Sequence, residues 1–415
     1  MYSMIVMRNR QVPITPNLNS NADRLRVTLD TVWEMGACSA WFENTHLSVF
    51  GGIPGEDVEV EIIRATRQFV AARVVEIYES SPYRVAPPCP YFGPCTGCEW
   101  QHIDYTHQLT LKREIVAKSF ADIPELANLK ILDVIPSEQT YGYRNHARFT
   151  VGPQGKLGFI NRTTRSFVAV DECRIMAPSI NSTLQKLQGH CGETSQVAIR
   201  LGVNTGETLI QPPLLSSGIP IATGQAYYRE SIAGMPFRIG SPSFFQVNTP
   251  QIQVMVEHIQ KHLDLQGSEV LIDAYAGVGT FAGLLSRYVR KVFAVEESKA
   301  AINDAKANLA SLNNIEFHQR RVEDALEKLE VPSSIVLLDP PRAGCHPRVL
   351  ETLTRTKPER VVYVSCDPKT LARDLRHLVT GGFEIAHVQP IDLFPQTHHI
   401  ECIVILHLKT EKTEG

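Results

Sequence analysis

The sequence has no long apolar run, and this absence excludes a membrane-spanning helix. Its first residues also lack the basic, apolar and small-residue pattern of a secretory signal. Nine cysteines among 415 residues are too few and too unevenly spaced for a secreted disulfide scaffold. We therefore expect a cytoplasmic protein without a membrane partner.

The sequence also lacks a strong charge of either sign, because 44 acidic residues oppose 41 Lys and Arg and leave a formal net charge of -3. A nucleic-acid site would therefore have to be a local basic patch. No internal repeat or low-complexity tract is present, and 43% hydrophobic with 20% charged residues is ordinary globular composition. A length of 415 residues allows about two to four domains.

The pattern of turn residues and apolar periodicity predicts four segments. Residues 1–22 are polar and aperiodic, and are expected to form a flexible tail. Closely spaced β-rich runs over residues 23–82 predict a small β-barrel. Residues 83–252 predict a mostly β central domain with a helix at 105–120, and alternating strands and helices over 253–410 predict an α/β domain with a parallel sheet.

Seven strands are predicted in the last segment, and no obvious helix joins the final two. This pattern favours a doubly wound sheet that ends in an antiparallel pair. The predicted strands are Glu269–Ala274, Lys291–Val295, Asn314–His318, Ser334–Leu338, Arg360–Val364, Glu384–Gln389 and Glu401–His407.

A glycine turn follows the first of these strands. Gly277 and Gly279 lie between an apolar run and a helix, where they let the backbone approach a ligand closely. Glu296 ends the next strand, where a carboxylate can accept hydrogen bonds from ribose hydroxyls. Gly283 lies four residues after Gly279, rather than the three expected for a nicotinamide dinucleotide, so S-adenosylmethionine is the better fit.

Three reactive side chains lie at the ends of later strands. Asp339 ends the fourth strand before two prolines, and Cys366 follows the fifth, so both are expected at the carboxyl edge of the sheet. Glu401 begins the last strand. A lone cysteine is more often a small buried hydrophobe, and a strand-end glutamate is often merely solvated. Together at one edge they predict a nucleophile and a base.

A second group of cysteines indicates a metal site. Cys89, Cys95 and Cys98 follow an x5 then x2 spacing with glycines and prolines between them, and Cys173 is the predicted distant fourth ligand. On spacing alone, four thiolates suit zinc or an iron–sulfur cluster equally.

From about residue 25 onwards the chain resembles the S-adenosylmethionine-dependent RNA uracil-5-methyltransferases, whose fold is a Rossmann-like class I methyltransferase domain. The resemblance implies that Cys366 is the nucleophile and Glu401 the proton acceptor. It also places Gln246, Tyr275, Glu296 and Asp339 in the cofactor or target-base pocket, with Gly277, Gly279 and Thr280 in the cofactor loop, although Thr280 stands where some members carry Asn. The motifs that carry the resemblance are Phe244–Asn248, Asp273–Phe281, Asp339–Arg342, Ser365–Leu375 and Asp392–Glu401.

The resemblance further implies a [4Fe-4S] cluster at the cysteine motif and a TRAM domain, an oligonucleotide-binding-like barrel, near the N-terminus. RNA is the implied partner, with 23S ribosomal RNA as the first expectation and the T-loop of transfer RNA as the alternative. No obligate protein partner is evident. The stretch Arg144–Arg174 carries six basic residues interleaved with Phe149, Phe159 and Phe167, which is typical of phosphate contact and base stacking but also of a solvated strand over a buried aromatic row.

Three other functions remain open at this stage. Cytosine-5 methylation shares the cysteine attack. An RNA-binding protein with an inactive methyltransferase half is opposed by the intact Cys366, Glu401 and Glu296. A small-molecule methyltransferase would leave the barrel and the central domain without a task.

Overall fold

A computed structural model describes residues 24–66, 69–216, 218–329 and 334–409. The predicted tail at residues 1–22 lies outside this range. The chain divides into two compact units, Met1–Asp104 with Ile160–Ser166, and Tyr105–Phe159 with Phe167–Gly415. The predicted boundaries at residues 22, 82 and 252 stay predictions.

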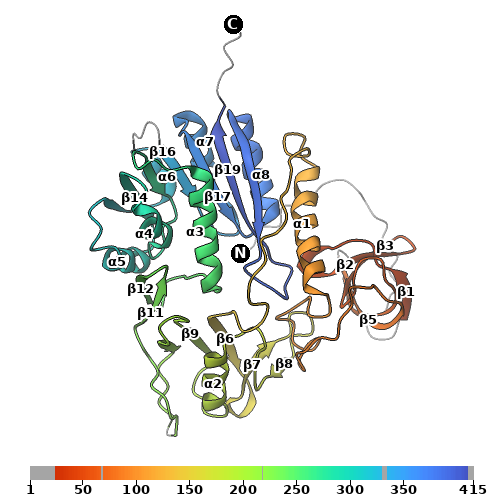
Figure 1. The fold of residues 1–415 in the computed structure, drawn as a ribbon. Coiled ribbons are helices and arrows are strands. Elements are labelled where there is room, and N and C mark those ends of the chain that lie inside the picture. Colours follow the sequence, from red (N-terminus) through yellow and green to blue (C-terminus); the bar gives the residue numbers. More distant parts are fainter. Residues whose placement is uncertain (1–23, 67–68, 217, 330–333, 410–415) are drawn as a thin grey trace. The chain divides into compact units, whose positions relative to one another are not determined.

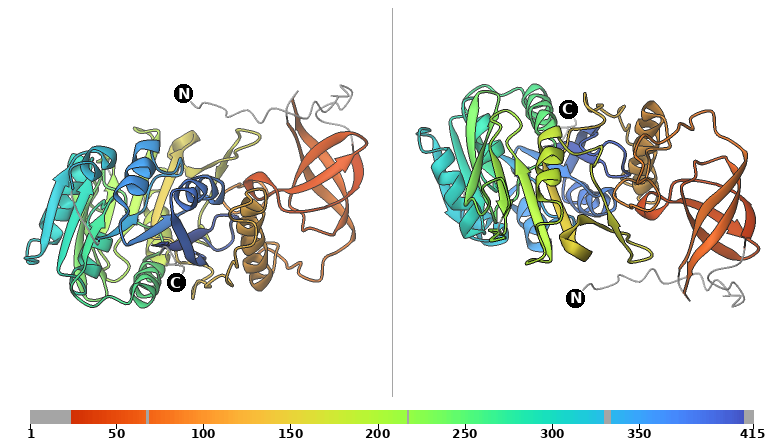
Figure 2. Two further views of the ribbon diagram at one scale, coloured as in Figure 1. Left: turned by 90° about the horizontal axis from the view of Figure 1, so that it is seen from above. Right: turned by 90° about the horizontal axis from the view of Figure 1, so that it is seen from below.

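The first unit contains a five-stranded sheet with the strand order β1-β4-β5-β3-β2. Strand β3 pairs with β5 in parallel, while the other neighbouring pairs are antiparallel. This is the strand order of an oligonucleotide-binding fold, and it encloses an apolar core with Leu47, Val49 and Val58 fully buried. Figure 2 shows the sheet from two sides. The strands are β1 Arg24–Thr28, β2 Cys38–Phe42, β3 Thr45–Phe50, β4 Asp57–Ala65 and β5 Val70–Glu79.

The second unit is built on a seven-stranded sheet with the order β15-β14-β13-β16-β17-β19-β18 (Figure 1). The first five strands run parallel, and β19 is antiparallel to both of its neighbours. The predicted seven-stranded α/β fold with a final antiparallel pair is confirmed. The strands are β13 Val270–Asp273, β14 Lys291–Glu296, β15 Ile315–Gln319, β16 Ser334–Leu338, β17 Arg360–Ser365, β18 Phe383–Ile391 and β19 Glu401–Leu408.

Both faces of this sheet are buried, which is why its strands read as continuous apolar runs. Successive residues alternate between two cores: Leu271 packs into one and Ile272 into the other, on opposite faces of β13. Helices α3 Thr249–Leu263 and α4 Thr280–Ser286 cover the first face, and α5 Lys299–Asn308 follows β14. The second face is covered by α1 Tyr105–Ala121, α6 Val322–Leu326, α7 Pro347–Thr356 and α8 Pro368–Thr380.

A second β region precedes this sheet along the chain. It has a five-stranded sheet of order β10-β9-β6-β7-β8, helix α2 and a separate hairpin. Phe149 is fully buried there and its ring packs on Phe159, so Phe149 belongs to the core and cannot stack on a base. The elements are β6 His146–Val151, β7 Leu157–Ile160, β8 Phe167–Ala169, α2 Pro178–Leu187, β9 Gln196–Leu201, β10 Thr208–Gln211, β11 Tyr227–Ile232 and β12 Met235–Gly240.

Candidate active site

Cys366 and Glu401 lie side by side at the carboxyl edge of the seven-stranded sheet. In the antiparallel register of β17 and β19, Ser365 is opposite Cys402. Cys366, which follows Ser365, therefore lies beside Glu401, which precedes Cys402. The parallel strands β13, β14 and β16 end at the same edge, with Asp273, Glu296 and, one residue beyond β16, Asp339. The sequence prediction that these groups share one edge is in agreement with this topology.

The Glu401 side chain is not a solvated strand end. Only 3% of the residue is exposed, and burial raises the pKa of its carboxyl well above the ordinary value, with Asp339 raising it further. Asp339 is only partly exposed, and burial raises the pKa of its carboxyl to about 7. Two neighbouring carboxyls disfavour ionising together, so one of the pair holds a proton more readily than either would alone. A carboxylate of raised pKa is a stronger base once it is ionised.

Cys366 lies in a half-buried position that by itself opposes thiolate formation. Burial and the neighbouring Glu401 raise the pKa of the thiol to about 12. Arg342 acts in the opposite direction, because the positive charge of its guanidinium lowers the pKa of both Cys366 and Glu401. The sequence prediction missed this role of Arg342, although the residue ends the quoted Asp339–Arg342 motif.

Replacement of Arg342 by Ala is expected to slow alkylation of Cys366. Loss of the cation raises the thiol pKa further, and each rise of about half a pKa unit lowers the thiolate fraction roughly threefold. The measurement is the iodoacetamide reaction rate at pH 8, followed by mass spectrometry of the Cys366 peptide. Arg348→Ala is the control, since Arg348 is exposed and pairs with Asp324 and Glu327. Equal rates in all three proteins would remove Arg342 from this account.

The glycine turn after β13 forms a cradle. Gly277 has a φ of +55° and open space where a Cβ would lie, so a ligand can approach its backbone. Gly279 has a φ of +88°, and a Cβ there would meet Leu309 Cδ1 at 2.7 Å. Glu296 fixes the turn, since its carboxylate accepts the Gly277 N–H at 2.9 Å and the Ser298 N–H at 2.7 Å. Its remaining lone pairs can accept ribose hydroxyls.

Asp273 provides a polar atom that is suited to a ligand in this cradle. Its Oδ2 accepts the Ala282 N–H at 2.9 Å, whereas its Oδ1 is buried with no hydrogen-bond partner among the described residues. Burial raises the pKa of Asp273 to about 7. An orphaned buried acceptor at the carboxyl end of the first strand, beside two positive-φ glycines, fits an adenosine-type cofactor with hydroxyl and amine donors.

Asp273→Asn is expected to raise the melting temperature more at pH 8 than at pH 5. The folded-state pKa lies above the unfolded value, so this carboxyl favours the native state at low pH and loses that contribution as pH rises through about 7. The amide removes the buried charge at pH 8 and still accepts the Ala282 N–H. The exposed Asp122→Asn variant is the control. Equal gains at both pH values would contradict the assignment.

The other predicted pocket residues have distinct surroundings. Tyr275 packs against the second core, and burial together with the neighbouring Cys345 raises the pKa of its hydroxyl. Thr280 is the first residue of α4 and is half-buried. Gln246 is half-buried, and its backbone carbonyl accepts a hydrogen bond from the Asn145 side-chain amide at 3.0 Å. Phe244, two residues earlier, is 70% exposed.

Helix α1 fixes the loop that delivers Glu401. Lys112 Nζ bonds Asp392 Oδ1 at 2.6 Å, and both side chains are fully buried. The Tyr105 hydroxyl donates to Asp392 Oδ2 at 3.1 Å, and Gln108 Nε2 donates to Gln396 Oε1 at 3.0 Å. Three polar side chains of one helix therefore bind the loop that precedes the last strand. The sequence analysis identified none of the three.

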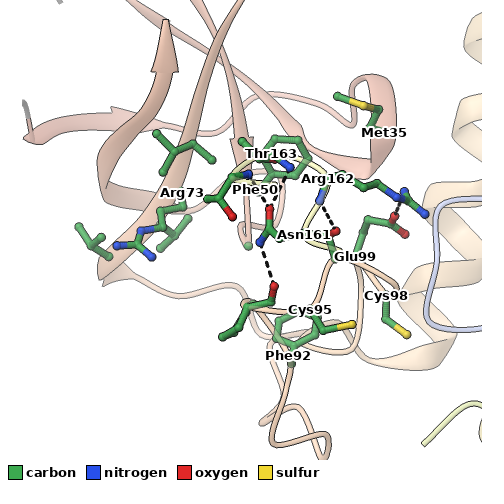
Figure 3. A pocket seen from close by; sticks show the side chains of 18 of the residues that line it. Met35, Phe50, Arg73, Phe92, Cys95, Cys98, Glu99, Asn161, Arg162 and Thr163 are labelled. Atoms are coloured by element: carbon green, nitrogen blue, oxygen red, sulfur yellow. Dashed lines mark hydrogen bonds and ion pairs between the residues drawn. The ribbon is translucent and has the colours of Figure 1, made fainter. Parts of the chain in front are cut away.

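The cysteine loop of the first unit lines a pocket of about 1000 Å³ (Figure 3). Cys95 and Cys98 lie on its wall, and Gly93 with a φ of +94° permits the turn between Cys89 and Cys95. None of these cysteines forms a disulfide. Burial raises the pKa of Cys95, and the nearby Gly97 backbone opposes that shift. Thiolates are the ligands that an iron–sulfur cluster requires.

Within the part of the chain that the structure describes, one group of side chains has at least three metal-ligating atoms that all lie within 4.8 Å of one another. It consists of His258, His262 and His387, which the sequence analysis did not single out. No helix among the described residues is long and apolar enough to span a membrane.

Comparison with known proteins identifies relatives of this chain. A family model described as tRNA (Uracil-5-)-methyltransferase matches residues 221–409. An uncharacterized RNA methyltransferase of Halalkalibacterium halodurans is 31% identical over 97% of this chain and 100% of its own length. Another, of Thermotoga maritima, is 33% identical over 86% of this chain and 93% of its own.

Among solved structures, the Pyrococcus abyssi tRNA (uracil-54, C5)-methyltransferase in complex with S-adenosyl-L-homocysteine has the same fold. Its TM-score is 0.73 at 24% identity, over 92% of this chain and 100% of that one. Nearly full-length relatives, the matching family model and a strand edge that carries Cys366, Glu401 and a glycine cradle lead to one conclusion: the chain belongs to the S-adenosylmethionine-dependent RNA (uracil-5-)-methyltransferase family.

Proposed function

We propose that this enzyme transfers a methyl group from S-adenosylmethionine to carbon 5 of a uridine in RNA, with Cys366 as nucleophile and Glu401 as proton acceptor. The observation that carries the proposal is the side-by-side position of Cys366 and the buried Glu401 beside the Arg342 guanidinium. The sulfonium of S-adenosylmethionine supplies the electrophilic methyl group and leaves as the neutral thioether.

The Cys366 thiolate forms a bond to carbon 6 of the uracil ring, and the electron pair of the 5,6 double bond moves into an enolate. Carbon 5 then takes the methyl group. The Glu401 carboxylate removes the remaining proton from carbon 5, the double bond re-forms, and the carbon–sulfur bond breaks to return the thiolate.

The target base has to leave its stack to reach Cys366. Phe244 supports this step, because it is an exposed aromatic side chain that precedes Gln246 by two residues. An aromatic face of this kind is suited to stack on an extruded base. The oligonucleotide-binding barrel, which we propose to be a TRAM domain, supplies a further RNA-contacting surface.

We propose 23S ribosomal RNA as the substrate, with the T-loop of transfer RNA as the alternative that the named activity of the Pyrococcus abyssi enzyme supports. The test is incubation of the purified enzyme with methyl-labelled S-adenosylmethionine and unmodified RNA, followed by nucleoside mass spectrometry of separate ribosomal and transfer pools. Label in 5-methyluridine of the ribosomal pool is expected. Label in the transfer pool would reassign the RNA, and label in 5-methylcytidine would overturn the target base.

We further propose that Cys89, Cys95, Cys98 and Cys173 hold a [4Fe-4S] cluster with a structural role, because no step above requires an electron. Cys95→Ser is expected to remove the cluster, since the cluster is bound through thiolates. Iron and sulfide analysis after anaerobic purification should give about four of each per wild-type chain and almost none for the variant. Cys191→Ser, at a buried cysteine outside the motif, is the control. Retention of iron in Cys95→Ser would contradict the ligand set.

A further inference from the structure

Three histidines meet where helix α3 packs beside the antiparallel end of the seven-stranded sheet. His258 and His262 lie four residues apart on α3, so they share one face of the helix. His387 comes from β18, immediately after a register shift between Ile385 and His387 in its pairing with β19. A bulge of this kind redirects side chains. The sequence-distant histidine is thereby brought to the helical pair.

The ring nitrogens converge rather than merely pack. His258 Nε2 and His387 Nε2 are 2.9 Å apart, and one ligand-type nitrogen from each of the three rings lies within 4.8 Å of the others. In a tetrahedral site with Zn–N bonds of about 2.0–2.1 Å, neighbouring ligand nitrogens are about 3.3 Å apart. Binding would require the His258–His387 contact to open slightly and the longer nitrogen–nitrogen separations, which reach up to 4.8 Å, to shorten.

A backbone hydrogen bond also fixes the position of the proton on one of the rings. His262 Nδ1 lies 2.9 Å from the backbone carbonyl of His258, and because a carbonyl can only accept, Nδ1 carries the proton and Nε2 keeps its lone pair. Ligating histidines in metalloproteins commonly donate their other N–H to a backbone carbonyl in this way.

We propose that His258, His262 and His387 form a binding site for one divalent transition-metal ion, with zinc as the metal that suits them best. Imidazole nitrogen is a ligand of Zn²⁺, Ni²⁺ and Cu²⁺, and three protein ligands leave a fourth position for water. Within the part of the chain that is described, no fourth His, Cys, Asp or Glu joins the group. The proposal is independent of the proposed function, because it concerns neither Cys366 nor the RNA.

The ion would act as a clamp between two elements that lead to the catalytic edge. Helix α3 begins directly after Gln246–Asn248, and β18 ends at Ile391, just before the Asp392 loop. Bonds from one ion to histidines of α3 and β18 would hold these two elements together, and with them the segments that lead to the catalytic edge. The expected consequence is greater stability of the second unit and not a direct chemical step.

The test is equilibrium dialysis of the metal-free full chain against Zn²⁺. Because the cysteine motif can also bind zinc, wild type is compared with His262→Gln and His387→Ala, and with the exposed His377→Ala as the matched control. We expect both site variants to bind one zinc fewer per chain than wild type and the control. Saturating zinc should raise the melting temperature of wild type by about 5 °C more than that of the variants.

A second readout keeps the test decisive if one variant is unstable. Co²⁺ added to the cysteine-blocked wild-type protein, alkylated after removal of metal, should give the visible absorption of a tetrahedral nitrogen–oxygen site, and His262→Gln should lack it. Equal zinc stoichiometry in wild type and both variants, or no cobalt spectrum from the alkylated protein, would overturn the proposal. The three rings would then be a stacked, hydrogen-bonded cluster only, with centroids 4.1–4.9 Å apart.

Discussion

Glu401→Gln is expected to stall the enzyme as a covalent complex between Cys366 and its RNA. The amide cannot accept the carbon 5 proton, so methylation proceeds but the carbon–sulfur bond cannot break. Turnover should fall by about 10²–10⁴-fold, the range that removal of a general base produces. The adduct should be visible as a band of reduced mobility on a denaturing gel that carries both labelled methyl and RNA.

Two controls define this result. Cys366→Ala in the Glu401→Gln background should give no adduct, and the exposed Glu351→Gln should turn over normally. Because burial favours the neutral form of Glu401, the amide should leave the melting temperature at pH 7 unchanged or raised. Loss of activity without an adduct, in a folded Glu401→Gln protein, would show that Glu401 acts before the carbon–sulfur bond forms.

The second large effect is expected at Lys112. Lys112→Met leaves the Asp392 carboxylate buried without its cation, and breaking one side of a buried ion pair costs about 3–5 kcal/mol. Calorimetric melting should therefore show a marked loss of stability, and methylation should fall because the Asp392–Ile400 loop precedes Glu401. The exposed Lys130→Met is the matched control.

The double variant Lys112→Met with Asp392→Asn separates the two causes of that loss. Removal of the orphaned charge should restore at least half of the lost stability, since the amide oxygen can still accept the Phe394 N–H at the Oδ1 position while the amide NH2 group faces the Tyr105 hydroxyl oxygen, which can accept. If the double variant were no more stable than Lys112→Met, the effect of Lys112 would come from packing of its stem and not from charge.

Much of the fold was predictable because its signals are local. Strands β13, β16, β17 and β19 are largely apolar runs, and a glycine turn with strand-end acids marks the carboxyl edge within a few residues of the strand ends. The predicted group of Cys366, Asp339 and Glu296 needed only the rule that parallel strands end together. The strand-end pattern also suggested Glu401 as the base, and the family resemblance added the role of Gln246, which no local pattern establishes.

The features that escaped prediction depend on contacts between distant residues. The buried pair of Lys112 and Asp392 joins positions 280 apart in the sequence, and a lysine at a helix position reads as a solvated side chain. His387 meets α3 only through a bulge in β18. Phe149 directly follows Arg148 in a stretch rich in basic residues, and only the packing of β6 shows that it lies inside. Contacts between residues that are distant in the sequence leave no periodic pattern in the sequence from which they could be predicted.

The measurement that tests the central claim most directly is release of hydrogen from carbon 5. RNA that carries tritium at carbon 5 of its uridines is incubated with enzyme and methyl-labelled S-adenosylmethionine, and water-borne tritium is compared with methyl groups bound to RNA. The mechanism through Cys366 and Glu401 predicts one tritium released for each methyl transferred, and none of either from Cys366→Ala. Methyl transfer without release of tritium would place the methyl on another atom and contradict the account.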